Sequence, residues 1–183
     1  MELSDVPYKV SYRDIKYPRI EFESGKLHFI LPFNHEPEAL YEKHEKWILR
    51  KIEFIENCLK EASNAEAVER TEGEFKDLIY SFVKKASSEL DAEINKIFFM
   101  AMKTKWASCS KKRNLTINKL MKYLPEKLLK YIVFHEIAHL KQKRHNDIFW
   151  EIISRKFNNY EDLEKELFIY WFKLASDDSS INY

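Results

Sequence analysis

The first part of the chain alternates apolar and polar residues, which is the pattern of strands with one buried face. The alternation covers residues 9–12 and 19–23, and an apolar-rich run follows at 27–31. Ser24–Lys26, between the second and third runs, contains a glycine and is a turn signal. The pattern predicts a hairpin that belongs to a small sheet, because an isolated hairpin is only marginally stable in water.

Helical spacing of apolar residues dominates most of the remaining chain. It predicts a helix from about residue 35 to Ala62, with Pro37 in its first turn, and a second helix from about Glu74 to Leu90. Three further helices are predicted at 126–141, at 147–156, and from residue 160 to a frayed tail at 176–180.

Between the second and third of these helices the pattern changes from helical to extended. Residues 94–102 are rich in β-formers and are apolar on both sides of the alternation from Ile97 on, which predicts a buried central strand. A polar loop is expected at 104–113 and a short strand at 115–118. Together the elements predict an α+β protein in which a small antiparallel or mixed sheet packs against several helices.

The length of 183 residues is sufficient for one domain with a hydrophobic core. An apolar fraction of 45% favours a packed globule over a disordered chain. We expect a single domain, residues 1–183, with four regions. These are a β-hairpin region at 1–35, a helical region at 36–91, a metal-binding core at 92–158, and a C-terminal helix and tail at 159–183.

Composition excludes several classes of function. A formal net charge of +1 gives no case for a dedicated nucleic-acid binder, and two glycines are too few for a Gly-rich phosphate loop. The N-terminus shows no signal-peptide pattern, and no apolar stretch approaches the ~20 residues of a membrane span. The two cysteines lie far apart and do not suggest a disulfide framework. A cytoplasmic protein is expected, and its oligomeric state is left open.

One stretch of the helix predicted at 126–141 carries chemistry. His135 and His139 stand four residues apart, so their side chains differ by about 40° around the helix and leave the same face. Two imidazoles in this arrangement can share one metal ion. Glu136 points about 100° away from His135, which is too far for a ligand but near enough to reach a water on the metal. It is the candidate general base.

A catalytic zinc site needs a third protein ligand and keeps a position open for water. His145 follows His139 by six residues and would point about 240° away from it if the helix continued. It can join the site only if the helix ends and the chain turns back near residues 141–144. The two polar residues after His145 are good N-caps for a new helix. Glu151 is the alternative third ligand.

Further motifs lie around the histidines in a set order. They are KTKWASCS at 103–110, Asn118 with Pro125, HEIAHL at 135–140, and HNDIFW at 145–150. Together these motifs resemble the YgjP-like metal-dependent hydrolases, a metallopeptidase-like family related to SprT-type proteins. The resemblance implies a zincin-like fold with the HExxH motif on a central helix, the three histidines as ligands, and Glu136 as base. Lys105 replaces the Arg of the family and Ala107 its Gly, and a lysine cannot form the bidentate contact of an arginine.

The predicted function is therefore a zinc-dependent, metallopeptidase-like hydrolase in which Glu136 assists attack of water on a peptide-type amide. Another divalent transition metal could replace zinc. Lys105, Trp106 and Arg113 are the candidate substrate contacts, although Trp106 also suits packing over the site. Cys109 is expected to be a small buried residue rather than a reactive thiol.

Two alternatives remain open at this point. The cationic residues at 103–113 suit a phosphoanhydride such as a nucleoside triphosphate, so the substrate partner is either a peptide or protein, or a nucleotide. The chain could also be a non-catalytic binding module that keeps its metal for stability.

Overall fold

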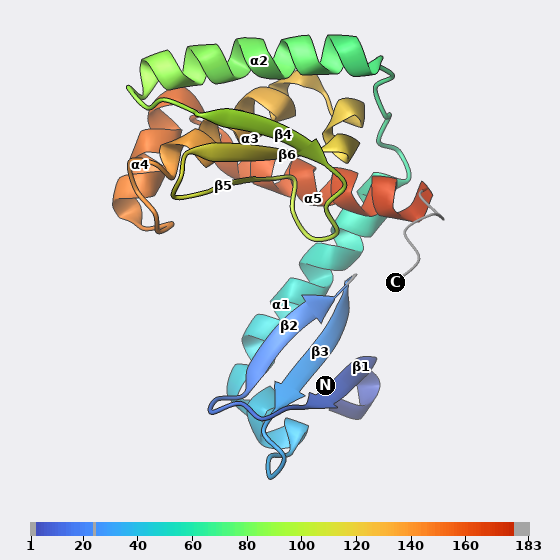
Figure 1. Cartoon of the computed structure of the whole chain (residues 1–183). Coiled ribbons are helices and arrows are strands. Elements are labelled where there is room, and N and C mark those ends of the chain that lie inside the picture. The colour runs from blue at the N-terminus through green and yellow to red at the C-terminus, as the bar shows by residue number, and fades with distance from the viewer. Residues whose placement is uncertain (1–2, 24, 178–183) are drawn as a thin grey trace. The chain divides into compact units, whose positions relative to one another are not determined.

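The computed structural model describes residues 3–23 and 25–177. The described chain forms five α-helices, two short 3-10 helices and two three-stranded sheets (Figure 1). It divides into two compact units, Met1–Glu61 and Ala62–Tyr183. The single-domain organisation expected from the sequence stays a prediction.

The N-terminal unit is a mixed sheet with one long helix. Its elements are η1 (Leu3–Asp5), β1 (Tyr8–Tyr12), β2 (Arg19–Glu23), β3 (Lys26–Leu31) and α1 (Pro37–Ala62). β2 and β3 form the predicted hairpin, and Gly25 in the turn has φ 81°, a conformation that glycine adopts without strain. β1 pairs with β3 in parallel, so β3 is the central strand. Its inner face packs with α1 in a small core that includes Phe29 and Ile48.

The second unit contains the remaining elements. They are α2 (Glu72–Glu89), β4 (Lys96–Met100), β5 (Ala107–Cys109), β6 (Asn114–Asn118), η2 (Lys119–Tyr123), α3 (Glu126–Ala138), α4 (Asp147–Lys156) and α5 (Tyr160–Asp177). β6 lies at the centre of the sheet, parallel to β4 and antiparallel to β5. A small mixed sheet packed against several helices confirms the α+β prediction.

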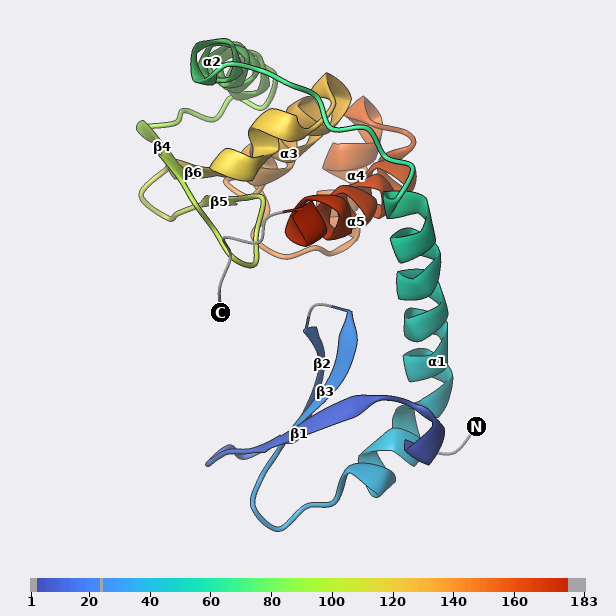
Figure 2. The same ribbon diagram turned by 90° about the vertical axis from the view of Figure 1, so that its right-hand side faces the viewer.

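Helix α3 lies at the centre of this unit. It contacts α2, β5, α4 and α5, and Figure 2 shows it with the strands on one side and α4 and α5 on the other. A helix that is apolar around most of its circumference is buried. Accordingly its fully or nearly fully buried residues are Leu128, Leu129, Tyr131, Ile132, Val133, Phe134, Ile137 and Ala138. The helix predicted to carry the HExxH motif is therefore central; it holds His135 and Glu136, and His139 is its C-cap.

The prediction of a buried central strand at 94–102 is wrong. β4 is shorter and lies at the edge of the sheet, with Phe98 43% and Met100 55% exposed. Only one face of β4 is covered, where Phe99 packs edge-on against Phe75 of α2 at a centroid distance of 5.7 Å. Apolar residues on both faces of β4 therefore did not predict the place of this strand in the sheet. The exposure of a strand depends on which other elements cover it, and the local sequence pattern does not specify those elements.

The remaining differences concern short segments. β5 lies inside the segment predicted as a polar loop, and α3 ends three residues before the predicted Lys141. Of the frayed tail predicted at 176–180, the first two residues belong to α5 and the rest lie outside the described residues. Within the described chain, no helix is both long and apolar enough to cross a membrane.

Candidate active site

The turn after α3 provides the break that the histidine spacing requires. α3 ends at Ala138, and the amides of Leu140 and Lys141 donate to carbonyls three residues earlier, each at 2.9 Å. Hydrogen bonds of this i→i−3 kind tighten the last turn of a helix. The chain therefore leaves the helix axis without a glycine, and His145 is free to approach the helix from outside.

The start of α4 fixes the place of His145. Asn146 is the N-cap, and its Oδ1 accepts the amide of Phe149 at 3.2 Å. Phe149 is fully buried, and its ring centroid lies 4.9, 4.6 and 4.7 Å from those of His135, His139 and His145. This phenyl ring is the apolar support against which the three imidazoles pack.

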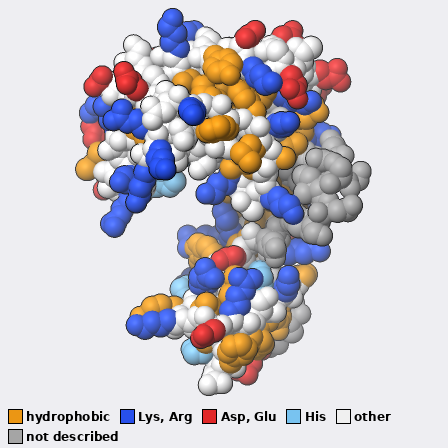
Figure 3. Space-filling view, in the orientation of Figure 1, with side chains coloured by type: hydrophobic (Ala, Val, Ile, Leu, Met, Phe, Trp, Pro, Cys, Tyr) orange, Lys and Arg blue, Asp and Glu red, His pale blue; other side chains and the backbone are white. Residues whose placement is uncertain are grey.

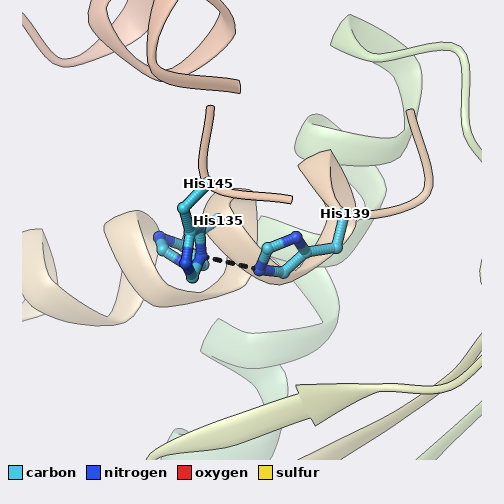
Figure 4. Close-up of side chains that lie close together, drawn as sticks. All are labelled: His135, His139 and His145. Atoms are coloured by element: carbon cyan, nitrogen blue, oxygen red, sulfur yellow. Dashed lines mark hydrogen bonds between the residues drawn. The ribbon is translucent and has the colours of Figure 1, made fainter. Parts of the chain in front are cut away.

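The structure brings the three predicted ligands together. The Nε2 atom of His145 lies 3.0 Å from the Nε2 of His135 and 3.0 Å from the Nε2 of His139 (Figure 4). All three candidate ligand atoms lie within 4.8 Å of one another. Glu151, the alternative third ligand, is outside this cluster and pairs instead with Arg155 on α4.

The protonation pattern of this cluster suits a divalent metal ion. His139 Nδ1 lies 3.2 Å from the carbonyl oxygen of Gln142, which can only accept, so Nδ1 carries the proton and Nε2 presents a lone pair. Burial, followed by the neighbouring His139 and His145, lowers the pKa of His135 to about 3. Burial likewise lowers the pKa of His145. Neutral imidazoles are the form that binds metals. Three nitrogen lone pairs that point at one place can all bind a single metal cation, whereas a single proton cannot be shared by all three.

The spacing of the nitrogens agrees with this assignment. Tetrahedral zinc with Zn–N distances of about 2.0–2.1 Å places its ligand nitrogens about 3.3 Å apart. The Nε2 atom of His145 lies 3.0 Å from the Nε2 atoms of His135 and His139, which is close to this value. The residues present therefore fit a metal held by His135, His139 and His145.

The side chain of Glu136 extends from α3 towards the sheet. Its Oε2 accepts the backbone amide of Cys109, in β5, at 2.8 Å. Burial raises the pKa of Glu136 to about 7, although the Cys109 amide and the nearby Lys105 act in the opposite direction. A carboxylate with a pKa near neutrality can both accept and donate a proton under ordinary conditions, as a general base requires.

A cleft of about 1120 Å³ opens over these residues. The three predicted substrate contacts, Lys105, Trp106 and Arg113, all line it, as do His135, His139, His145 and Glu136. Figure 3 shows Lys and Arg side chains gathered beside a histidine on the second unit. Trp106 also packs edge-on against Trp171 of α5, at a centroid distance of 4.9 Å, so it supports the wall of the cleft as well as facing it.

Sequence comparison decides the family of this chain. The model of the family described as YgjP-like, metallopeptidase domain, matches residues 60–169, which is more than half of the chain. The chain belongs to the YgjP-like family. Membership agrees with the resemblance carried by the motifs around the histidines, and it supports a metal-dependent hydrolase.

Individual proteins match over shorter stretches. The UTP pyrophosphatase of Escherichia coli (strain K12) is 35% identical over 57 residues, which are 31% of this chain and 34% of that protein. The match thus spans about a third of that relative's length.

Solved structures give partial matches. The metallopeptidase zymogen of Pyrococcus abyssi abylysin shows 23% identity and a TM-score of 0.45, and that of Methanocaldococcus jannaschii jannalysin shows 35% and 0.43. Each alignment covers 49% of this chain and 90% of the other.

Cys109 is a thiol that lines the cleft over the histidines. Burial, with a smaller contribution from the charge of Glu136, raises the pKa of this thiol to about 11. The thiol therefore stays protonated near neutral pH, and it is neither a nucleophile nor a ready metal ligand. This agrees with the expectation that Cys109 is not a reactive thiol, but the residue is only partly buried and not buried as expected.

Sequence reasoning missed two groups near the histidines. Tyr131 and Glu164 lie beside His135, and the hydroxyl of Tyr131 donates to Glu164 Oε1. The four-residue spacing from Tyr131 to His135 on one helix face was a usable signal. Nothing local identified Glu164, because it reaches the site from α5.

Asn118 holds the loop that carries two of the candidate substrate contacts, Lys105 and Trp106. It is fully buried, and its Nδ2 donates to the carbonyls of Met102 and Lys105, each at 2.8 Å. Its Oδ1 accepts the amide of Leu120 at 3.2 Å. The side chain thereby connects the end of β6 to the loop between β4 and β5.

We expect Asn118→Ala to lower the free energy of unfolding by about 2–4 kcal/mol, because it leaves two carbonyls without their donor. Urea unfolding followed by circular dichroism measures the loss. Asn95→Ala is the matched control, since Asn95 Nδ2 also donates to a loop carbonyl, that of Lys112, at 2.7 Å but in an exposed position. Water can replace that bond, so the expected loss is below about 1 kcal/mol. Equal losses for the two variants would contradict the role of Asn118.

Proposed function

We propose that this protein is a zinc-dependent hydrolase that cleaves peptide-type amides, with Glu136 as general base. The observation that carries the proposal is the position of Glu136, between the metal-binding histidines of α3 and the edge strand β5. The three histidines would hold the ion, which when bound polarises the scissile carbonyl and lowers the pKa of an attacking water.

The residues of the chain supply the proton transfer. Oε2 of Glu136 is engaged by the amide of Cys109, so the carboxylate has a fixed orientation and its Oε1 is left to take a proton from the attacking water. The same carboxyl group can then give that proton to the leaving nitrogen. The pKa of about 7 suits both steps.

The strand β5 supports a peptide as substrate. Among the described residues β5 pairs only with β6, and the Cys109 amide points away from β6 towards Glu136. The outer edge of β5 therefore faces the cleft that its residues line. An extended peptide can add to such an edge as a further strand, which would present its backbone carbonyls to the site.

A second candidate is hydrolysis of a phosphoanhydride. Four cationic residues line the cleft in addition to Lys141, which pairs with Asp91. They are Lys105, Lys111, Arg113 and Lys143. Cations of this kind stabilise a polyphosphate transition state. The name of the Escherichia coli relative, a UTP pyrophosphatase, points in the same direction.

A panel of substrates separates these candidates. The zinc-loaded protein is incubated with an unstructured protein and with the common nucleoside triphosphates, each with and without a chelator. We expect chelator-sensitive peptide cleavage, detected by mass spectrometry, and no release of phosphate or pyrophosphate. Chelator-sensitive release from a nucleotide, without peptide cleavage, would establish the second candidate instead. No turnover on any substrate, together with unfolding on metal removal, would indicate a binding module and overturn both.

A further inference from the structure

The histidine cluster has a carboxylate neighbour on the side away from its converging nitrogens. Oε1 of Glu164, on α5, lies 3.6 Å from Nδ1 of His135. The hydroxyl of Tyr131 donates to the same Oε1. Tyr131 is fully buried. It precedes His135 by one turn of α3, and the centroids of the two rings lie 5.8 Å apart. Three residues from two helices thus form a connected group: Tyr131, Glu164 and His135.

His135 needs an acceptor at this position. Its Nδ1 is buried and has no hydrogen bond within 3.5 Å in the described structure, and Glu164 is the carboxylate beside it. The corresponding atom of His139 already donates to the Gln142 carbonyl. If His135 Nε2 is to present a lone pair to a metal, its proton must sit on Nδ1. A contraction of a few tenths of an ångström brings Glu164 into hydrogen-bond range.

We infer that Glu164, held in place by Tyr131, is a positioning residue for the metal centre. It accepts the Nδ1 proton of His135 and thereby fixes both the tautomer and the ring orientation that direct Nε2 to the metal. The inference rests on the proposed function, since it presupposes that the three histidines bind an ion. It assigns to α5, which contributes no metal ligand, a part in building the site.

The role of Glu164 as acceptor for a ligating histidine sets the size of its expected effect on metal affinity. Carboxylates that accept the second ring proton of a ligating histidine typically contribute 10–100-fold to metal affinity. Burial and the hydrogen bond with Glu164 raise the pKa of Tyr131 above its ordinary value, so the hydroxyl stays protonated and continues to donate to the carboxylate. Tyr131 thus limits the freedom of Glu164 without competing for the proton of His135.

The test measures zinc affinity by competition with a chromophoric chelator. We expect Glu164→Ala to weaken zinc binding by about 10–100-fold. Glu164→Gln keeps an acceptor oxygen but loses the charge. Its zinc affinity should lie between the affinities of Glu164→Ala and the wild type. Glu166→Ala is the matched control. Glu166 lies two residues away on α5 and also pairs with α3, through Lys127 at 2.7 Å, but unlike Glu164 it is not among the residues that line the cleft. The zinc affinity of Glu166→Ala should stay within about threefold of that of the wild type.

A second readout is the visible spectrum of the Co²⁺-substituted protein. Glu164→Ala should change the d–d bands because the imidazole geometry changes, whereas Glu166→Ala should leave them as in the wild type. Glu164→Ala also leaves the buried Tyr131 hydroxyl without its acceptor. Should that variant fail to fold, the double variant Tyr131→Phe with Glu164→Ala removes the orphaned group and is compared with Tyr131→Phe alone.

The outcomes distinguish this inference from the proposed function. If the wild type binds zinc and His139→Ala does not, but Glu164→Ala binds as tightly as Glu166→Ala, then only the role of Glu164 is overturned. If the wild type and His139→Ala bind zinc equally weakly, the proposed metal site fails, and the inference fails with it.

Discussion

Glu136→Gln is expected to lower the turnover of the zinc-loaded protein by about 10²–10⁴-fold, the range attributed to general acid–base catalysis. Glutamine has the same shape as glutamate, and its carbonyl oxygen can still accept the Cys109 amide that now donates to Oε2 at 2.8 Å. It cannot accept a proton from water. Because Glu136 is not among the clustered ligands, zinc affinity should stay within about threefold of wild type.

Steady-state kinetics on the substrate found in the panel, together with zinc competition, measure both quantities. Glu93→Gln is the control, because Glu93 also lines the cleft but is exposed and stands apart from the histidine cluster. Its turnover should change by less than about twofold, as expected of a surface carboxylate whose removal affects only weak, screened electrostatics. Unchanged turnover in Glu136→Gln would exclude Glu136 as the base while leaving the metal site intact.

Phe149→Ala is expected to lower the free energy of unfolding by about 3–5 kcal/mol, the usual cost of truncating a buried phenylalanine. Phe149 is fully buried, and its ring contacts all three histidine rings as well as Trp150, at a centroid distance of 5.2 Å. The cavity would lie directly behind the imidazoles. Zinc affinity should therefore fall too, because the rings lose the surface that holds them in place.

Urea unfolding in the presence of a chelator isolates the packing effect, since any contribution from bound metal is removed. Phe98→Ala provides the comparison. Phe98 is 43% exposed on the edge strand β4, so its truncation should cost about 1 kcal/mol or less. Similar losses for the two variants would show that Phe149 is not part of the cooperative core of the second unit.

The helix α4 and the turn that precedes it were predicted well from the sequence. The observed α4 has the predicted bounds, Asp147–Lys156, and Asn146 caps it as its side chain suggested. The chain turns back after α3, as the spacing of His139 and His145 required. These features depend on interactions between residues a few positions apart, such as capping, helix period and turn formation. Local sequence is therefore enough to specify them.

Position within the sheet was predicted poorly. The apolar run around β4 resembles a central strand, yet the central strand is β6, whose Leu115 and Ile117 are fully buried. β5 is three residues long and was hidden in a polar segment. Strand order depends on pairing between segments far apart in the chain, and composition reports only how apolar a strand is, not which of its faces and edges other elements cover.

By itself, the sequence determined which candidate side chains can share a helix face. The spacing of His135 and His139 places both imidazoles on one helix face with Glu136 beside them, and it left the third ligand open between His145 and Glu151. Only the tertiary structure decided that His145 joins the two histidines, and what surrounds the cluster. Cys109 meets Glu136 across 27 residues, and Glu164 approaches His135 from another helix. Contacts of this kind arise when separate elements pack on one core, and no local period encodes which elements will meet.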